Sequence, residues 1–570
     1  MPRDVTLVLA PSASPPPVED APALLRLAAT ELRIPPERLL EVRPTKLSFD
    51  ARARHRSWRL ALRVWERGEI APEPIRIDPP DLARPSERAP RVVVVGSGPA
   101  GLFAAIDALA AGLCVTVVER GKDVRARRRS IRALNRGEPV DPDSNYCFGE
   151  GGAGTYSDGK LYTRSGERES IQGVLEMLVA HGAPREILVS WRPHVGSNRL
   201  PRVVEALRET IRRAGGEVLF GARAEEIETN ATRGDRRRAE VVWIRRIESG
   251  ERIRLAADAV VLATGHSALD SLLMARRAGA RLVPKGFAMG LRTEHPQPWL
   301  DARQYGGLRG PCDLPASFYE LATRADERGV WSFCMCPGGF IVPATTDSGR
   351  VVVNGMSLSR RDSPFANSGI VVGIEPEDWC AERGERWGWR ELLARAEALG
   401  EPLRFEGSIE LPVKPEDDPL FGVRLQLALE RVAAHAGGGE RRAPAQRADL
   451  FAEGRGRTAP ALATSYPPGA TAVDLGEVLP RGLHKRLRRA FQDFDQQLPG
   501  FASEIGQCLG VESRTSSPVR IVRDPETLVS PEVEGLYPCG EGAGHAGGIV
   551  SAALDGRRVA AALARALARA

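Results

Sequence analysis

The fold of this chain is decided by the stretch Arg91-Val-Val-Val-Val-Gly96-Ser97-Gly98-Pro99-Ala100-Gly101-Leu-Phe-Ala-Ala-Ile. Four consecutive valines are typical of a strand that is buried on both faces, as in a parallel sheet. Three glycines at G-x-G-x-x-G spacing follow, and the alanine-rich segment behind them predicts a helix. Gly96 permits a tight turn, Gly98 lets the backbone approach a pyrophosphate, and Gly101 lets the helix pack closely against the strand. The helix N-terminus would offer N–H groups and the positive end of its dipole to phosphates.

A second strand, Val115-Thr-Val-Val-Glu119, ends in an acidic residue. Its distance from the glycines is close to the roughly 20 residues that separate fingerprint and ribose-binding acid in this motif. The same glycine spacing recurs at Gly149–Gly154 and Gly542–Gly547, but neither has both a following helix and a later strand with an acid. The sequence therefore predicts one dinucleotide site and argues against a second, independent NAD(P) domain.

Composition predicts a soluble protein of two to four domains, because 570 residues exceed one ordinary core. Hydrophobic residues make up 42% and charged residues 27%. The net charge of +6 comes almost entirely from arginine, since only 6 of the 80 basic residues are lysine. Basic clusters at 125–132 and 485–489 are interpreted as solvated helix faces, so nucleic-acid binding is not favoured.

Cysteine and histidine usage carries two further expectations. The 8 cysteines are scattered, which favours reduced thiols and a cytoplasmic location. The 8 histidines show no paired ligand spacing, so we expect no metal. We also expect no membrane span, because no window approaches the roughly 18 apolar residues that one requires.

The order of predicted elements divides the chain. Residues 1–85 read β-α-β-β and predict a small ferredoxin-like α+β module, followed by a proline-rich linker. Residues 90–284 contain the fingerprint, a strand meander, and a buried strand that ends in Ala263-Thr264-Gly265. Residues 285–505 change to short strands and amphipathic helices, which we interpret as an inserted α+β substrate domain. Residues 506–570 end in strand, glycine turn and helix, and return to the first domain.

A glycine-rich loop runs from Asn145 to Lys160 and has five glycines between 149 and 159. So many glycines cannot form a packed element, and Cys147, Phe148 and Tyr156 are not typical of a solvent-exposed linker. The loop is therefore expected to approach a ligand closely.

Long motifs elsewhere support a more specific interpretation: Lys46–Arg52, Cys147–Leu161, Phe333-Cys-Met-Cys-Pro-Gly-Gly339, Val351–Ser357, Glu512–Arg520 and the Gly540-Glu541 turn. Together with the fingerprint they resemble flavoproteins with two dinucleotide folds, and most closely the bacterial NAD(FAD)-utilising, FAD-dependent dehydrogenases, whose substrates are largely unassigned. The resemblance runs nearly end to end and is loosest between residues 379 and 442. Glu541 stands where many related flavoproteins have Asp.

The resemblance implies an α/β fold of glutathione-reductase-like kind, with a Rossmann-type FAD-binding domain built from discontinuous segments. Pyrophosphate would lie at Gly96–Gly101, the adenosine ribose at Glu119, and the adenine near Ala224. The flavin would lie near Gly151–Gly154 and Gly540–Ile549, with a helix beginning at 547–549 aiming its positive end at the ring. The full set of expected cofactor residues is Gly96, Ser97, Gly98, Pro99, Ala100, Gly101, Glu119, Arg120, Gly151, Gly152, Ala153, Gly154, Ala224, Thr264, Gly265, Gly540, Glu541, Gly547, Gly548 and Ile549.

Candidates for chemistry are few, because a flavin itself carries the hydride. His545 is the candidate general acid or base, and Lys160 and Arg514 are candidates for holding an anionic substrate group or for structural ion pairs. Cys334-Met-Cys336 is C-x-C rather than C-x-x-C, which favours packing or substrate-facing thiols over a disulfide relay. For Cys147 and Cys539, proximity to flavin and simple burial both remain open.

We therefore expect an FAD-dependent oxidoreductase that transfers hydride between flavin and a small organic substrate, with NAD(P)H as a candidate electron donor. Three alternatives remain, and one is a non-catalytic flavin-bound sensor, which would bind flavin tightly but be reduced by no donor. A flavin monooxygenase is less favoured, because the Gly-Asp turn of those enzymes and the stretch that follows it are missing. A flavin-dependent RNA-modifying or RNA-binding protein would show retention of tRNA that depends on salt.

Overall fold

The computed structural model describes residues 2–11, 16, 18–51, 56–73, 76–162, 167–231, 236–306, 314–401, 418–439, 441–456 and 459–568. Arg52, the last residue of the Lys46–Arg52 motif, lies outside them. Among these residues, none of the helices combines the length and apolar character needed to cross a membrane. Likewise, within these ranges no group of three or more His, Cys, Asp and Glu side chains could hold a metal ion.

The N-terminal module is an antiparallel sheet with strand order β1-β3-β2 and one helix packed on it. Its strands and helix are β1 (Arg3–Leu9), α1 (Ala21–Leu32), β2 (Leu39–Asp50) and β3 (Ser57–Glu66). In β3 the buried side chains of Trp58, Leu60, Leu62 and Val64 alternate with more exposed ones, as a half-buried strand requires. The β-α-β-β order agrees with the sequence pattern, but the described part of residues 2–90 has no second helix and fourth strand. It is therefore smaller than a ferredoxin-like fold.

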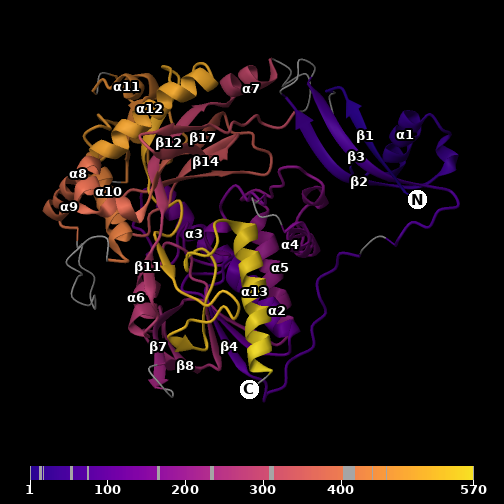
Figure 1. The fold of residues 1–570 in the computed structure, drawn as a ribbon, viewed down its shortest axis with the longest axis horizontal. Helices are drawn as coiled ribbons and strands as arrows, with labels where there is room; N and C mark the ends of the chain where they lie inside the picture. The colour runs from indigo at the N-terminus through magenta and orange to yellow at the C-terminus, as the bar shows by residue number, and fades with distance from the viewer. Residues whose placement is uncertain are drawn as a thin grey trace.

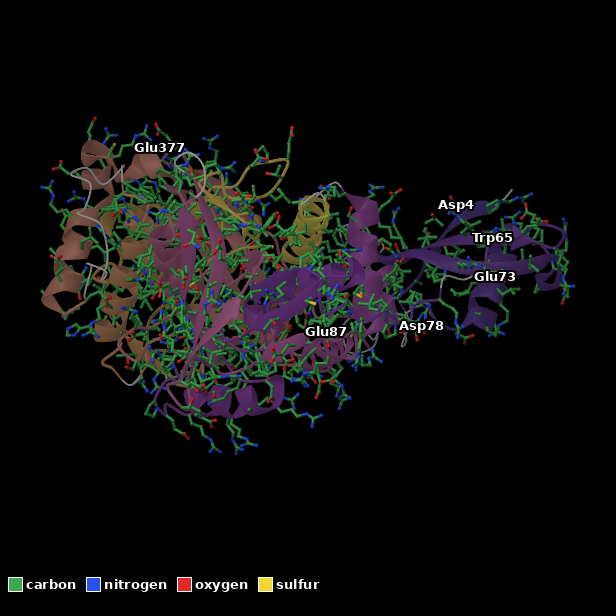
Figure 2. All side chains as sticks on the ribbon, turned by 90° about the horizontal axis from the view of Figure 1, so that it is seen from below. Asp4, Trp65, Glu73, Asp78, Glu87 and Glu377 are labelled. Atoms are coloured by element: carbon green, nitrogen blue, oxygen red, sulfur yellow. The ribbon has the colours of Figure 1, made fainter. Side chains whose placement is uncertain are left out.

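The module projects from the body of the protein, as Figure 2 shows with Asp4 and Trp65 at one end of the molecule and Glu377 at the other. Asp78 and Glu87 lie on the connecting segment, whose described residues form neither helix nor strand. Several contacts connect the module to the rest of the protein, among them a hydrogen bond of 3.0 Å from the Arg56 guanidinium to the Gln304 carbonyl. Leu47 exchanges backbone hydrogen bonds with Val189 and Trp191, and Trp58 packs in a small cluster with Tyr305 and Leu314.

A parallel five-stranded sheet forms the centre of the dinucleotide domain. Its order is β23 (Leu536–Pro538), β10 (Ala259–Leu262), β4 (Arg91–Val95), β5 (Cys114–Val118) and β6 (Glu217–Leu219). Val92 and Val94 face a core that contains α2 (Pro99–Ala110), α5 (Leu200–Arg213) and α13 (Ile549–Leu567). Val93 and Val95 face a second core on the opposite side of the sheet. The valine run is therefore buried on both faces, as predicted.

The far end of the chain completes this sheet. Strand β23 pairs with β10, and α13 lies against α2, seen as the yellow helix beside α2 in Figure 1. The two helices cross so closely that a Cβ at Gly556 would lie 2.1 Å from the Ala100 carbonyl oxygen.

The second face of the parallel sheet is covered by the predicted meander and a helix. The meander contains β7 (Ala222–Ala231), β8 (Arg237–Arg246) and β9 (Arg252–Ala256), and β22 (Val533–Glu534) adds to β8. The helix is α6 (Leu269–Arg277), and a two-stranded sheet of β11 (Leu282–Pro284) and β21 (Val519–Ile521) leads to and from the next domain. The remaining helices of this part are α3 (Val124–Asn135) and α4 (Arg168–Ala180), with short 3-10 turns at Gly152–Gly154 and Arg185–Leu188.

The intervening residues form a seven-stranded sheet packed against helices. Its order is β13 (Ala322–Ala325), β14 (Arg328–Cys336), β17 (Phe365–Ile374), β12 (Phe287–Pro296), β20 (Gln507–Glu512), β18 (Ala443–Arg447) and β19 (Ala470–Ala472). A separate hairpin consists of β15 (Gly339–Pro343) and β16 (Val353–Ser357). The helices are α7 (Gln297–Tyr305), α8 (Ala381–Trp387), α9 (Trp389–Ala398), α10 (Phe421–Ala436), α11 (Ala448–Glu453) and α12 (Arg481–Gln497), with a 3-10 turn at Pro376–Trp379.

Strand β20 changes one expected boundary. Residues 506–515 were expected in the dinucleotide domain, whereas β20 pairs with both β12 and β18 in the seven-stranded sheet. The chain therefore returns to the first domain only at β21, which follows β20 and pairs with β11.

Candidate functional site

A cleft runs along the carboxyl ends of strands β4, β5 and β10 and is closed on the other side by residues of the inserted domain. Parallel sheets bind ligands at this edge, where strand order reverses. Sixteen of the twenty residues expected to bind a cofactor line it: Gly96, Ser97, Gly98, Pro99, Ala100, Glu119, Arg120, Gly152, Ala153, Gly154, Ala224, Thr264, Gly265, Glu541, Gly548 and Ile549.

The other four expected residues are not part of the lining, and three of them shape it. A Cβ at Gly101 would lie 1.9 Å from the Gly96 carbonyl oxygen, so Gly101 sets the packing of helix on strand. Gly151 and Gly540 have φ values of +77° and +75°, in the left-handed region that favours glycine. The backbone N–H of Gly547 donates to the Ser551 hydroxyl at 3.1 Å, in the first turn of α13.

The fingerprint has the geometry of a close backbone approach. Gly96 has φ +104°, and a Cβ there would lie 2.4 Å from the Ala263 carbonyl oxygen. Gly98 is different, since its φ is −71° and the nearest atom to an added Cβ is the Gly152 Cα at 4.0 Å. A side chain at position 98 would therefore enter the cleft without striking the protein. The N-terminus of α2 begins directly behind it, at Pro99.

Glu119 is buried, and both of its carboxylate oxygens accept hydrogen bonds. One oxygen accepts from the Ser97 backbone N–H at 3.1 Å and its hydroxyl at 2.7 Å. The other accepts from the backbone N–H groups of Gly121 and Gly149, at 2.8 and 3.1 Å. Glu119 therefore joins the fingerprint to the second glycine loop in addition to facing the cleft. Its neighbour Arg120 lies over the Phe148 ring, with the guanidinium 4.4 Å from the ring centroid.

The second glycine loop is held by a buried arginine that the sequence analysis misassigned. Arg127 was interpreted as part of a solvated helix face, but its side chain is fully buried. It donates five hydrogen bonds of 2.7 to 3.1 Å to backbone carbonyls of residues 145, 146, 149, 150 and 152. The helix presents this one arginine to the loop while Arg128 and Arg129 face solvent.

Beside this loop, Glu150 forms a buried ion pair with Arg208, at 2.9 Å. Burial raises the pKa of Glu150 to about 7. The pair anchors the loop to helix α5, so two separate side-chain systems fix the backbone that faces the fingerprint.

Of the three candidates for chemistry, Lys160 lines both the cleft and the smaller cavity beside it. Its ammonium lies 3.8 Å from the sulfur atoms of both Cys334 and Cys336 and 3.6 Å from a carboxylate oxygen of Asp158. It also donates to the Met335 carbonyl.

Arg514 lines the cleft, but its guanidinium is paired with Glu430 through two hydrogen bonds of 2.8 and 2.7 Å. It therefore acts as a structural ion-pair partner. His545 is not among the lining residues, and its Nε2 lies 3.0 Å from the Ile521 carbonyl oxygen. Burial lowers the pKa of His545 to about 4. The structure does not support His545 as the acid or base of this site, since it faces the β21 backbone.

The two thiols whose role the sequence left open also differ in whether they line the cleft. Cys147 lines the cleft, where its sulfur lies 3.3 Å from the Ala344 carbonyl oxygen. Cys539 is fully buried and does not line it.

The inserted domain adds residues that sequence reasoning did not assign. Phe333, Cys334, Asn354 and Gly355 line the cleft opposite the fingerprint. Behind them Arg292, fully buried, pairs with Glu512 at 2.8 Å and donates to the Cys334 carbonyl at 2.7 Å. The available signal was a charged residue directly after the apolar run Phe287–Leu291, since such a residue is rarely buried without a partner.

His266 and Glu541 form a second unassigned pair in the lining. The His266 Nδ1 lies 3.5 Å from a Glu541 carboxylate oxygen. The pair joins the turn after β10 to the turn after β23, the two turns that the sequence had marked independently.

A second, smaller cavity adjoins the cleft and shares Lys160 and Cys334 with it. Its remaining lining includes Arg192, Glu320 and Arg361. Arg192 pairs with Glu320 at 2.7 Å, and Arg361 pairs with Asp158 at the same distance.

Comparison with known proteins identifies the family. Residues 286–395 and 408–515 match the model of the C-terminal domain-like region of FAD-dependent proteins, and residues 91–130 match an FAD-binding domain. A curated protein of Clostridium beijerinckii, described as uncharacterized, is 39% identical over 473 residues, which cover 82% of this chain and 80% of the relative. The chain belongs to this family of FAD-dependent proteins. It is an FAD-dependent oxidoreductase whose substrate is unassigned.

Among solved structures, this FAD-dependent protein is similar to a geranylgeranyl bacteriochlorophyll reductase-like protein of Thermoplasma acidophilum. The identity is 13% over 84% of this chain and 79% of the other, with a TM-score of 0.36. It is also similar to CtdE in complex with FAD, at 12% identity over 85% and 89% of the chains and a TM-score of 0.29. TM-scores this low do not define a shared reaction.

The residues that line and shape the cleft fit FAD. The Gly98 position is open towards the cleft, the α2 N-terminus faces the same space, and buried Glu119 lies at the end of β5. The first residues of α13, Gly548 and Ile549, reach the same cleft from the other end of the chain. The cleft therefore offers a positive helix end both to a pyrophosphate and to a flavin ring.

Proposed function

We propose that this protein transfers hydride between bound FAD and a small organic substrate, with NAD(P)H as the electron donor that completes the cycle. The observation that carries the proposal is the shared wall of the two cavities. Lys160 and Cys334 border the cofactor cleft on one side and the smaller cavity on the other. A substrate in the smaller cavity would lie next to the cofactor and beside one cation.

In this proposal, FAD lies with its pyrophosphate at Gly96–Gly101 and its flavin beneath Gly152–Gly154 and the start of α13. FAD supplies the hydride chemistry when it is bound. The chain supplies position and electrostatics. The N-terminus of α13 and the ammonium of Lys160 stabilise negative charge at the reactive end. Phe333 and Cys334 are half-buried at the cleft wall and reduce the access of water to that end.

We also propose a domain organisation consistent with this cycle. Residues 90–284 and 516–570 form a glutathione-reductase-like FAD-binding domain, and residues 285–515 form an inserted α+β substrate domain. Residues 1–85 form a separate module. The β12–β20 pairing and the β11–β21 pair support the shifted boundary.

The experiment is to purify the full chain, record its visible spectrum, identify the released flavin, and mix the holoenzyme anaerobically with NADH or NADPH. Bleaching of the flavin band by either nucleotide is the expected result. A holoenzyme that retains an oxidised spectrum with both nucleotides would contradict NAD(P)H as the electron donor. Loss of FAD in Gly98→Val would support the placement of the pyrophosphate. Rapid reoxidation by oxygen with formation of a hydroxylated product would favour a monooxygenase instead.

A further inference from the structure

Two thiols of strand β14 are held at the wall between the cleft and the smaller cavity. Cys334 has φ +46°, in the left-handed region, at an irregularity in the pairing of β14 with β17. The Cys336 thiol donates to the Cys334 carbonyl at 3.3 Å. A non-glycine residue in this backbone region is uncommon and points to a conformation that its surroundings impose. Both sulfur atoms of this C-x-C sequence lie 3.8 Å from the Lys160 ammonium.

Two cations surround this pair. The Lys160 ammonium lies 3.8 Å from each sulfur, and an Arg292 guanidinium nitrogen lies 3.5 Å from the Cys336 sulfur. Hydrogen bonding from Cys336, together with these cations, lowers the pKa of the Cys334 thiol well below its usual range. The neighbouring Cys334 and burial raise the pKa of the Cys336 thiol. One thiolate and one thiol is the state of a dithiol prepared for exchange.

The fixed charges agree with that state. Lys160, Arg292 and Arg361 face two carboxylates, Asp158 and Glu512, through ion pairs of 2.7 to 3.6 Å. One positive charge is therefore left over in a buried cluster. A thiolate on Cys334 would neutralise this positive charge. Because an uncompensated buried charge is costly, the cluster favours the thiolate.

The two thiols also differ in access. Cys334 lines both cavities, whereas Cys336 is fully buried behind it and lines neither. Cys334 can therefore meet the cofactor from one side and a molecule in the smaller cavity from the other, with Cys336 positioned to resolve it.

We propose that Cys334 and Cys336 are a redox-active dithiol that exchanges two electrons with the bound FAD. The Cys334 thiolate and the Cys336 thiol form one S–S bond. The electron pair and the single thiol proton would pass to an oxidised flavin held in the cleft, which would serve as the two-electron acceptor. In the reverse direction the S–S bond would break as the two sulfur atoms receive two electrons and one proton. The pair is thus a second two-electron centre beside the flavin, an assignment that the C-x-C spacing alone did not favour.

The test counts electrons in the holoenzyme. Air-equilibrated protein is made anaerobic and titrated with dithionite, with the equivalents expressed per bound flavin. Because a disulfide and a flavin each accept two electrons, the wild type should consume about twice what its flavin requires, and Cys334→Ser only what the flavin requires. Cys380→Ser serves as the matched control, because Cys380 lines neither cavity and should leave the doubled count unchanged.

A second measurement needs no variant. Denaturing the air-equilibrated wild type in iodoacetamide, followed by peptide mass spectrometry, should find residues 334 and 336 joined and unalkylated, and both alkylated after dithionite. Equivalents for flavin alone, with both cysteines alkylated in the oxidised protein, would overturn the proposal. A disulfide from Cys334 to Cys147, which also lines the cleft, would overturn the pairing. Neither readout uses NAD(P)H or a substrate, so failure here is distinct from failure of the proposed hydride transfer.

Discussion

Replacement of Arg127 by methionine should loosen the second glycine loop and with it the cofactor site. Methionine preserves much of the buried volume and removes all five donated hydrogen bonds. Each carbonyl left without a partner in a buried position costs about 1–3 kcal/mol, so the unrelaxed sum would be about 5–15 kcal/mol. Water and loop movement recover part of this sum, and the cost of burying the cation disappears. We therefore expect a net loss of about 3–5 kcal/mol, as for other broken buried charge networks.

The assay compares urea unfolding of the FAD-free protein, followed by circular dichroism, with an FAD titration followed by flavin fluorescence. The transition to measure is the one that bound FAD shifts, because a multidomain chain can show more than one. FAD affinity should fall at least about tenfold, because a loss of about 1.4 kcal/mol of binding free energy corresponds to that factor. Lysine at position 127 should rescue only part of the loss, because an ammonium has at most three donors.

The control is Arg129→Met on the same helix, where the side chain is exposed and a change of no more than about 0.5 kcal/mol is expected. Equal, small effects of the two substitutions would refute the reasoning, because the five hydrogen bonds would then contribute nothing to loop or cofactor.

Three further perturbations have expected outcomes. Gly98→Val should fold with an unchanged urea midpoint yet bind no FAD, because its side chain fills open cleft, whereas Gly101→Val should lower the midpoint, since its Cβ meets the Gly96 carbonyl oxygen at 1.9 Å. Lys160→Met should slow alkylation of Cys334 by iodoacetamide in the dithionite-reduced, folded protein at neutral pH by about tenfold or more, measured by peptide mass spectrometry, as the thiolate loses its nearest cation. An unchanged rate would place the thiolate's stabilisation elsewhere. Burial lowers the pKa of His295 to about 4, so the native state resists a proton that the unfolded chain accepts below about 6.5. Relative to His295→Phe, the wild type should therefore lose unfolding free energy as the pH falls from 6.5 to 4, by up to about 1.4 kcal/mol per pH unit, and a difference independent of pH would contradict this.

The parts of the fold that could be predicted are those in which neighbouring residues carry the signal. Val92 to Val95 alternate between two cores, so a run of valines is sufficient to predict a strand buried on both faces. The turn and helix behind it follow from Gly96 and Gly101, whose missing side chains are required by backbone atoms only a few residues away or on the adjacent strand. Structure that depends on residues close together in the chain can therefore be predicted from short sequence patterns.

The parts that could not be predicted depend on distant segments. Arg127 resembles its exposed neighbours in sequence, and its burial is determined by a loop that begins at Asn145. Arg514 faces Glu430, and His545 faces Ile521, through contacts that no spacing rule encodes. Lys160 meets the two cysteines across more than 170 residues of chain. The expected boundary at residue 506 shows the same dependence, since β20 is placed by its partners β12 and β18.

The closing of the parallel sheet by β23 and α13 also has a consequence for how the protein is made. These elements leave the ribosome after the whole inserted domain, although α13 packs on the early helix α2. During translation the fingerprint strand and helix must therefore wait with an apolar face uncovered while several hundred residues are added, at about 5–20 residues per second. The inserted domain would then fold first, and FAD would be captured only after β23 and α13 have been made. Nascent chains halted before residue 536 should bind chaperones and retain no flavin. Chains extended through α13 should lose the chaperones and bind flavin at the same chain length.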